Sequence, residues 1–238
     1  DELLALFGEE PLDCEFAVTR QANREVLWLL QVRPLIIPTI PESKTAQAAR
    51  LESIQRKVAR GMQPHPFLMG RRTVYGVMPD WNPAEIVGIR PKPLALSLYR
   101  ELITDAIWAY QRHNYGYRNL RSFPLMPHFF GLPYIDVRLS FNSFIPADLD
   151  EGLAGRLVDH YIDRLLEEPA LHDKVEFEIV FSCYTLDLPE RLERLAEAGF
   201  SKHEREAIAH SLRNLTNRIV HPKDGLWHGD AAKIDTLN

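Results

Sequence analysis

Four side chains near the start of the sequence have the types that bind a metal ion and a phosphate group. Asp13 and Glu15 lie two residues apart, and so do Gln31 and Arg33. In a β-strand, residues two apart point to the same face, so each pair would present its side chains together. Carboxylate oxygens bind Mg²⁺, and the planar guanidinium group of arginine matches phosphoryl oxygens. The alternative is an ordinary exposed hairpin of mixed charge.

The segments that carry these four residues predict a β-hairpin. Two short apolar runs, residues 11–17 and residues 27–34, flank a polar turn at residues 19–25. Such runs on either side of a short polar segment are typical of two antiparallel strands. The hairpin would place the acidic pair beside the amide and the guanidinium group.

The same segment resembles a known family. The order Asp-x-Glu-Phe-Ala, a turn, and then aliphatic residues leading to Leu-Gln-x-Arg-Pro is similar to the end of the ATP-grasp nucleotide-binding domain in the phosphoenolpyruvate synthase / pyruvate phosphate dikinase family. Leu6-Phe7-Gly8 and Pro11 also match the residues that precede this motif in the family. The resemblance covers residues 1–35, and Cys14 departs from it, because the family usually has an aliphatic residue there.

The resemblance implies roles for the four side chains. Glu15, with Asp13 beside it, would be a Mg²⁺ ligand, and Gln31 and Arg33 would contact the phosphates of ATP. The implied activity is ATP-dependent phosphotransfer to a small-molecule acceptor, with pyruvate as one possibility. The sequence has neither the Thr/Ser-His pair of the family's phosphohistidine domain nor its pyruvate-binding barrel, so we assign no catalytic residue.

The beginning of the sequence also bears on this expectation. It starts at Asp1 without a methionine, and most of an ATP-grasp domain would lie upstream of the hairpin. We therefore expect the chain to be an internal piece of a longer multidomain protein, inactive by itself and in contact with other domains of that protein.

Composition excludes several classes of partner. The net charge is −5 and the isoelectric point is near 6.0, which gives no electrostatic support for nucleic-acid binding. No apolar run approaches the roughly 20 residues of a membrane-spanning helix. Cys14 and Cys183 lie far apart and form no metal-binding or redox motif. These features favour a cytoplasmic protein that contacts no membrane.

The chain as a whole predicts an α+β fold in three parts. Residues 1–35 would be the end of the ATP-grasp domain, residues 36–70 a proline-rich linker followed by a helix, and residues 71–238 an accessory α+β domain with amphipathic helices and a small sheet. The spacing of apolar residues predicts helices at 46–62, 94–112, 148–168, 187–199 and 201–219, and strands at 71–77, 134–141 and 174–184.

A second class of function is a docking or ligand-recognition module in residues 71–238. Its candidate surfaces are a basic segment at residues 112–121, an acidic pair at Glu176 and Glu178, and the polar face of the strand predicted at 134–141, made by Tyr134, Asp136, Arg138, Ser140 and Asn142. Each has an ordinary alternative as a solvated surface. Convergence of the basic segment and the polar face on one pocket would favour a ligand site.

Overall fold

The computed structural model describes residues 2–8, 11–21, 24–35, 42–77, 82–221 and 225. The chain divides into two compact units, Asp1–Ala49 and Arg50–Asn238, which we describe separately. Helices and small antiparallel sheets occur together, so the predicted α+β class is confirmed. Within the described ranges, no helix combines the length and the apolar character that crossing a membrane requires.

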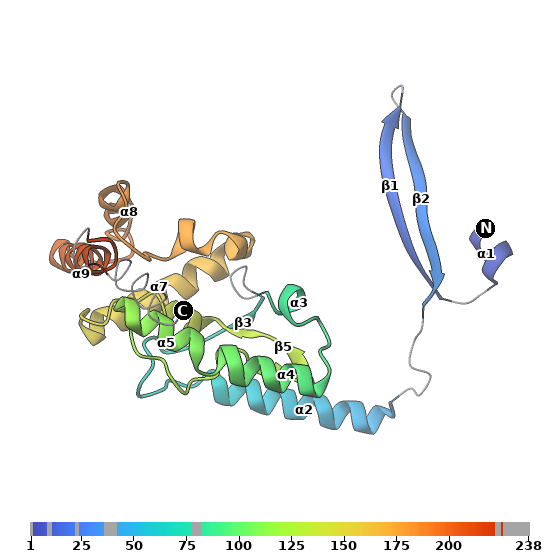
Figure 1. Ribbon diagram of the computed structural model, residues 1–238, viewed down its shortest axis with the longest axis horizontal. Helices are drawn as coiled ribbons and strands as arrows, with labels where there is room; N and C mark the ends of the chain where they lie inside the picture. The colour runs from blue at the N-terminus through green and yellow to red at the C-terminus, as the bar shows by residue number, and fades with distance from the viewer. Residues whose placement is uncertain are drawn as a thin grey trace, which may run out of the picture. The chain divides into compact units, whose positions relative to one another are not determined.

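The first unit is built on the predicted hairpin. Helix α1 (Glu2–Phe7) precedes strand β1 (Leu12–Gln21), which pairs antiparallel with β2 (Arg24–Pro34), and Figure 1 shows the two strands as long arrows. Both strands run further than expected, into the segment predicted as a turn. Residues 22–23, between them, and most of the proline-rich linker lie outside the described residues.

The second unit contains most of the helices. Helix α2 begins in the first unit and continues into the second. The helices of the chain after the hairpin are α2 (Lys44–Gly61), α3 (Pro83–Ile86), α4 (Pro93–Tyr99), α5 (Ile107–Tyr115), α6 (Val137–Asn142), α7 (Glu151–Glu167), α8 (Leu188–Arg194) and α9 (Lys202–Val220). Between these helices lie two π-helices, η1 (Arg100–Thr104) and η3 (Val175–Ile179), and one 3₁₀ helix, η2 (Pro169–Asp173), among the described residues.

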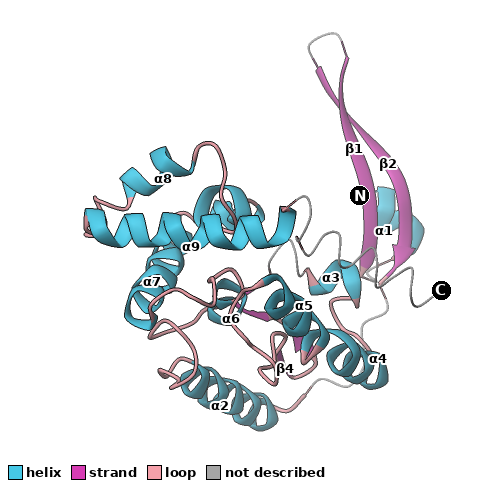
Figure 2. Cartoon of the chain, turned by 60° about the vertical axis from the view of Figure 1, so that its left-hand side comes forward, coloured by secondary structure: helices cyan, strands magenta, loops and turns pink. Residues whose placement is uncertain are grey.

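The strands described in this unit are each two residues long. Strand β3 (Tyr75–Gly76) pairs with β6 (Ile135–Asp136), and β4 (His128–Phe129) pairs with β5 (Leu132–Pro133). Figure 2 shows them as small magenta pieces among the helices. The strand predicted at 71–77 is therefore shortened to β3.

Helices α6 and α7 carry the centre of the core. They pack against each other, and α7 also contacts η3. The largest side chains that are almost fully buried include Phe141, Ile145, Leu157, Tyr161 and Ile162. The predicted apolar stripe of α7 is buried as expected, at Leu153, Leu157, Tyr161 and Leu165. The helix begins at Glu151 with Asp150 as its cap, rather than with Asp148 as predicted.

The single helix predicted at 94–112 is wrong, because η1 interrupts it. Asp105 N donates to Arg100 O at 2.8 Å, which closes a wide turn and adds a residue to the helical repeat. The buried side therefore changes from Leu96 in α4 to Trp108 and Ala109 in α5. The apolar residues whose four-residue spacing predicted one continuous helix are instead largely exposed, at Leu94, Leu98, Leu102 and Tyr110.

The strand predicted at 134–141 is also wrong. The chain is extended only at β6 and then turns into α6, where Oδ1 of Asp136 accepts a hydrogen bond from Leu139 N at 3.1 Å. Every residue of α6 is buried, on its polar and apolar sides alike. The alternation of polar and apolar residues therefore reflects a buried polar cluster and not a strand with one solvent-exposed face.

The strand predicted at 174–184 is replaced by η3 and an irregular extended segment. Val175 and Ile179 are buried, whereas Phe177 is 76 % exposed. Residues spaced by four satisfy both the repeat of a strand and that of a helix. The sequence pattern alone could not separate the two, and packing against α7 and η2 selected the helical turn.

Candidate functional site

The hairpin brings the four predicted site residues onto one face. Its register pairs Asp13 with Arg33 and Glu15 with Gln31, directly across the two strands. Since residues two apart share a face, all four side chains lie together. The predicted grouping of Asp13, Glu15, Gln31 and Arg33 is therefore present, although their role in binding stays a prediction.

Within this group, Arg33 is held by Asp13. Its Nε donates to Oδ2 of Asp13 at 2.8 Å, and its Nη2 lies 2.7 Å from the same oxygen. The hydrogen bond and the charge of Asp13 raise the pKa of Arg33 above its ordinary value. The carboxylate therefore occupies the Nε and Nη2 edge of the guanidinium group, and Nη1 has no partner among the described residues.

The second pair lies beside a break in the strand register. The pairing shifts between Glu15 and Phe16, because Leu30 is an extra residue on β2. Bulges of this kind bend a strand and redirect the neighbouring side chains, and they are frequent next to active sites. Glu15 and Gln31 are exposed, and within the described residues their side chains have no hydrogen-bonding partner.

The oxygen donors of the hairpin are few for a magnesium ion held by protein alone. No group of three or more acidic, histidine or cysteine side chains is close enough to hold a metal among the residues that the structure describes. Mg²⁺ at nucleotide sites usually takes one or two protein carboxylates, and the substrate phosphates and water supply the rest. Glu15 alone, or Glu15 with Asp13, fits that smaller requirement. Asp13 fits it less well because Arg33 already occupies one of its oxygens.

The second unit does not bring its predicted surfaces together. The arginines of the basic segment are each engaged locally: Arg112 lies over Phe144, Arg118 pairs with Glu151, and Arg121 lies over Tyr110. The predicted polar face is mostly buried in α6. The pocket that would have combined these two surfaces is therefore absent from the described residues.

The buried polar cluster of α6 instead connects distant segments. Arg138 donates from Nη1 to Gln63 O at 2.9 Å and from Nη2 to Gly61 O at 3.1 Å. Asp136 accepts from Thr73 Oγ1 at 2.6 Å, and burial raises the pKa of its carboxyl group above the ordinary value. These contacts tie the end of α2 and the strand β3 region to the core, which is a structural role.

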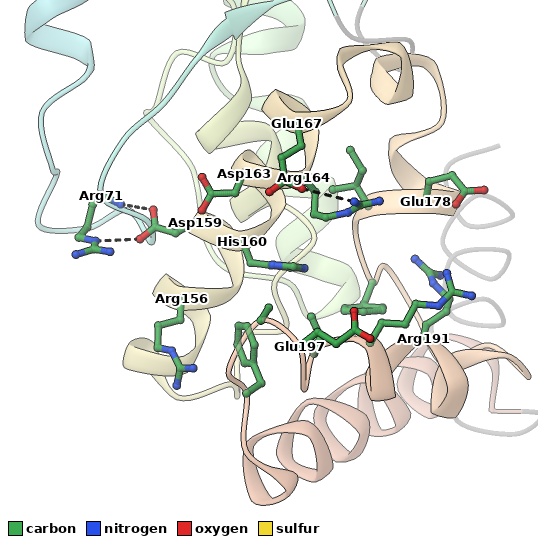
Figure 3. A pocket seen from close by; sticks show the side chains of 16 residues that line it. Arg71, Arg156, Asp159, His160, Asp163, Arg164, Glu167, Glu178, Arg191 and Glu197 are labelled. Atoms are coloured by element: carbon green, nitrogen blue, oxygen red, sulfur yellow. Dashed lines mark hydrogen bonds and ion pairs between the residues drawn. The ribbon is translucent and has the colours of Figure 1, made fainter.

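The second unit also has a large cavity, and of the candidate residues predicted from the sequence, Glu178 is the one found in its described lining. It measures about 710 Å³ and lies among α7, η3, α8 and the turn that follows α8 (Figure 3). Its lining combines five arginines and five acidic residues with His160, over a floor of buried apolar side chains. Arg71 Nε pairs with Asp159 Oδ2 at 3.1 Å, and Arg164 Nη1 with Glu167 Oε2 at 3.6 Å.

His160 lies in the middle of this cavity lining (Figure 3). Its ring packs against Phe200, with ring centroids 5.9 Å apart. Burial, and then the nearby charge of Arg164, lower the pKa of His160. Burial thus favours the neutral form of the imidazole, and no residue that the structure describes hydrogen-bonds to it.

A weak signal for the cavity was present in the sequence. Helix α7 has charged residues and a histidine at positions 156, 159, 160, 163, 164 and 167, which is one continuous face of a helix. Such a face usually meets solvent. The structure shows that η3 and the turn after α8 fold beside it, and residues so distant in sequence are joined only by tertiary packing. Comparisons of the chain with family models, curated proteins and solved structures gave no match.

Proposed function

We propose that this chain is part of an ATP-dependent phosphotransferase of the phosphoenolpyruvate synthase-like type, and that its hairpin contacts the phosphates of Mg-ATP. The observation that carries the proposal is the register of β1 and β2. It presents a carboxylate, an amide and a guanidinium group side by side on one face. These are the groups that bind a metal ion and phosphoryl oxygens.

The contacts within the hairpin suggest a division of roles. Glu15 would hold Mg²⁺ together with the ATP phosphates, and the ion would supply charge neutralisation for phosphoryl transfer. Arg33 and Gln31 would donate hydrogen bonds to the phosphates. Asp13 would orient Arg33, since the two side chains are already hydrogen-bonded. Asp13 is the candidate for a second metal ligand, because a carboxylate has two oxygens.

The opposite face of the hairpin supports the proposal in a different way. It is apolar and exposed: Phe16 is 62 % exposed, Val18 55 %, Leu27 66 % and Leu29 49 %. A two-stranded hairpin is marginally stable by itself, and an apolar face of this extent normally packs on other structure. The remainder of an ATP-grasp domain is the cover that we propose.

Location and partners follow from the same proposal. Both cysteines are free, as is usual in a reducing compartment, and we place the protein in the cytoplasm, where ATP is available. The partners would be ATP, a small-molecule acceptor such as pyruvate, and other domains of the same protein. Nucleic acid and membranes are not among them.

The test uses the longer protein that contains this chain. It is incubated with Mg-ATP, with and without pyruvate, and phosphate, AMP and ADP are measured. We expect pyruvate-dependent release of AMP and phosphate, lost in Arg33→Ala and in Glu15→Ala. Arg20→Ala is the matched control, because Arg20 lies on the opposite face of the same hairpin and is equally exposed.

The possible results separate the parts of the proposal. AMP formation that ignores pyruvate would retain the nucleotide site and require another acceptor. If neither Arg33→Ala nor Glu15→Ala changes ATP affinity relative to Arg20→Ala, the hairpin is structural and the proposed site is wrong.

A further inference from the structure

The cavity of the second unit has the size and floor of a small-molecule site. Its volume of about 710 Å³ falls in the range of roughly 300–1,000 Å³ that ligand sites occupy. The floor is made by four buried apolar side chains, Ile179, Phe181, Leu195 and Phe200. A floor of this kind matches an organic molecule with an apolar body better than a bare ion.

Arg191 stands apart from the other arginines of the cavity. Four of the five have a carboxylate partner in the described chain: Arg71 with Asp159, Arg156 with Glu204, Arg164 with Glu167, and Arg194 with Glu190. Arg191 has no carboxylate within ion-pair distance there, and its charge adds only to the larger effect of the Thr185 hydrogen bond in lowering the pKa of Asp187. A cation of the cavity lining therefore lacks a counter-ion at hydrogen-bonding distance.

The side chain of Arg191 is nevertheless fixed in place. Its Nη2 donates to Val180 O at 2.9 Å, and its guanidinium carbon lies 4.9 Å from the centre of the Phe181 ring. The remaining N–H groups are not enclosed by protein. An oriented guanidinium group of this kind binds carboxylates and phosphates at a low entropic cost.

Among the acidic residues of the cavity lining, some are paired with an arginine and others are not. Asp159, Asp163 and Glu167 pair with arginines. Within the described ranges, the side chains of Glu197 and Glu178 have no partner, and Figure 3 shows Glu197 on the turn after α8, on the far side of the cavity from α7. These carboxylates would repel a ligand that carries only negative charge and would attract an ammonium group.

We propose that this cavity binds a small zwitterion of the amino-acid class. Its carboxylate or phosphate would pair with Arg191, its ammonium group would face Glu197, and its apolar body would rest on Phe181 and Phe200. The imidazole of His160 is positioned to add a hydrogen bond. This site lies within the second unit and does not depend on the Mg-ATP proposal for the hairpin.

The first experiment compares three probes on the purified 238-residue chain, using calorimetry and amide chemical shifts. The probes are L-phenylalanine, 3-phenylpropionate, which lacks the ammonium group, and phenethylamine, which lacks the carboxylate. We expect L-phenylalanine to bind about tenfold more tightly than either analogue, because each analogue lacks the charged group that makes one of the charge-assisted contacts. The shifted amides should belong to α7, η3 and the turn after α8.

Variants assign each charge to its residue. Arg191→Met should weaken L-phenylalanine and 3-phenylpropionate by about tenfold and leave phenethylamine unchanged. Glu197→Gln should do the reverse, weakening L-phenylalanine and phenethylamine only. The matched controls are Arg213→Met, which removes an arginine stacked on Tyr184 outside the cavity, and Glu206→Gln, which removes an exposed carboxylate of α9.

Two results would overturn the proposal. One is equal affinity for the three probes, since the charged groups of the ligand would then contribute nothing to binding. The other is the absence of saturable shifts at cavity amides with L-phenylalanine, L-leucine and L-methionine at concentrations up to about 10 mM. If Arg191→Met does not fold, Glu197→Gln decides the question alone, because Glu197 is exposed and its loss leaves the core intact.

Discussion

Arg33 and Asp13 form a two-point contact across the hairpin, with Arg33 Nε 2.8 Å and Nη2 2.7 Å from the same carboxylate oxygen. Both side chains are substantially exposed, at 60 % and 38 %. Exposed ion pairs add little to stability, so the contact matters for orientation more than for folding. It fixes one edge of the guanidinium group and leaves the other edge for a ligand.

This contact predicts that the two carboxylates of the hairpin are not equivalent. Glu15→Gln should raise the Mg²⁺ concentration needed for ATP binding by about tenfold, because it removes a charged ligand. Asp13→Asn should leave the Mg²⁺ requirement unchanged and weaken ATP binding a few-fold, because it loosens Arg33. Calorimetric titrations of ATP at several Mg²⁺ concentrations measure both effects. Equal changes in the Mg²⁺ requirement would make Asp13 a second metal ligand.

The buried arginine of α6 should be essential for stability. Arg138→Met keeps most of the apolar stem but leaves the carbonyl groups of Gly61 and Gln63 without their donor. It also removes the positive charge that favours the ionised form of the buried Asp136 carboxyl group. Loss of one partner in a buried charged cluster costs roughly 3 kcal/mol or more. Urea denaturation measures this loss, and Arg213→Met, on the exposed side of α9, should change the free energy of unfolding little.

The buried carboxyl group of Asp136 should make the free energy of unfolding depend on pH. Burial raises its folded pKa above the ordinary value of 3.8, so its contribution to stability is fully present below that value and is lost as the pH rises through the folded pKa. Asp136→Asn keeps an oxygen that can accept from Thr73 and Leu139 but cannot ionise. The free energy of unfolding of the wild type should therefore fall relative to that of the variant as the pH increases above 3.8.

The measurement for Asp136 is a series of denaturation curves from acidic to neutral pH for both proteins. Parallel profiles would show that the carboxyl group has no raised pKa in the folded state. Asp136→Ala is the second variant, because it removes the helix cap as well, and it should cost about 1 kcal/mol or more at every pH.

Replacing Gly70 should destabilise the protein through a steric clash as well as backbone strain, and Gly88 is the matched position at which only the strain acts. Its φ is +86°, and an added Cβ would lie 2.7 Å from Cγ1 of Val158. Gly88 has a similar φ of +91° with open space around it. Both Gly70→Ala and Gly88→Ala carry the strain of a left-handed backbone, but only Gly70→Ala should add a clash, costing about 1–3 kcal/mol more. Thermal denaturation of the two variants gives the difference, and equal losses would contradict the close approach.

The sequence was sufficient to predict elements that depend mainly on residues close together in the chain. The helix predicted at 201–219 is present as α9, and Ser201 and Glu204 form both halves of a capping box at its start. The apolar residues at four-residue spacing in α7 are buried as expected. The two apolar runs on either side of the polar turn correctly predicted the antiparallel hairpin, because the runs and the turn specify the same pairing.

Where two local structures fit the same residues, tertiary contacts decided. The segments 134–141 and 174–184 alternate like strands, yet Asp136 caps a helix in the first, and η3 packs against α7 in the second. The helix predicted at 94–112 is interrupted by a wide turn that moves the buried side to Trp108. In each case the apolar spacing was compatible with both outcomes, and burial against another segment selected one.

The sequence by itself determined the α+β class, the hairpin with its four chemically suggestive side chains, and the amphipathic helices α7 and α9. The tertiary structure alone decided that Arg138 is a core residue and that Arg191, His160 and Glu197 share a cavity. The physical reason is the range of the interactions. A hairpin register or a helix cap depends on residues a few positions apart, whereas a cavity depends on which distant faces pack together.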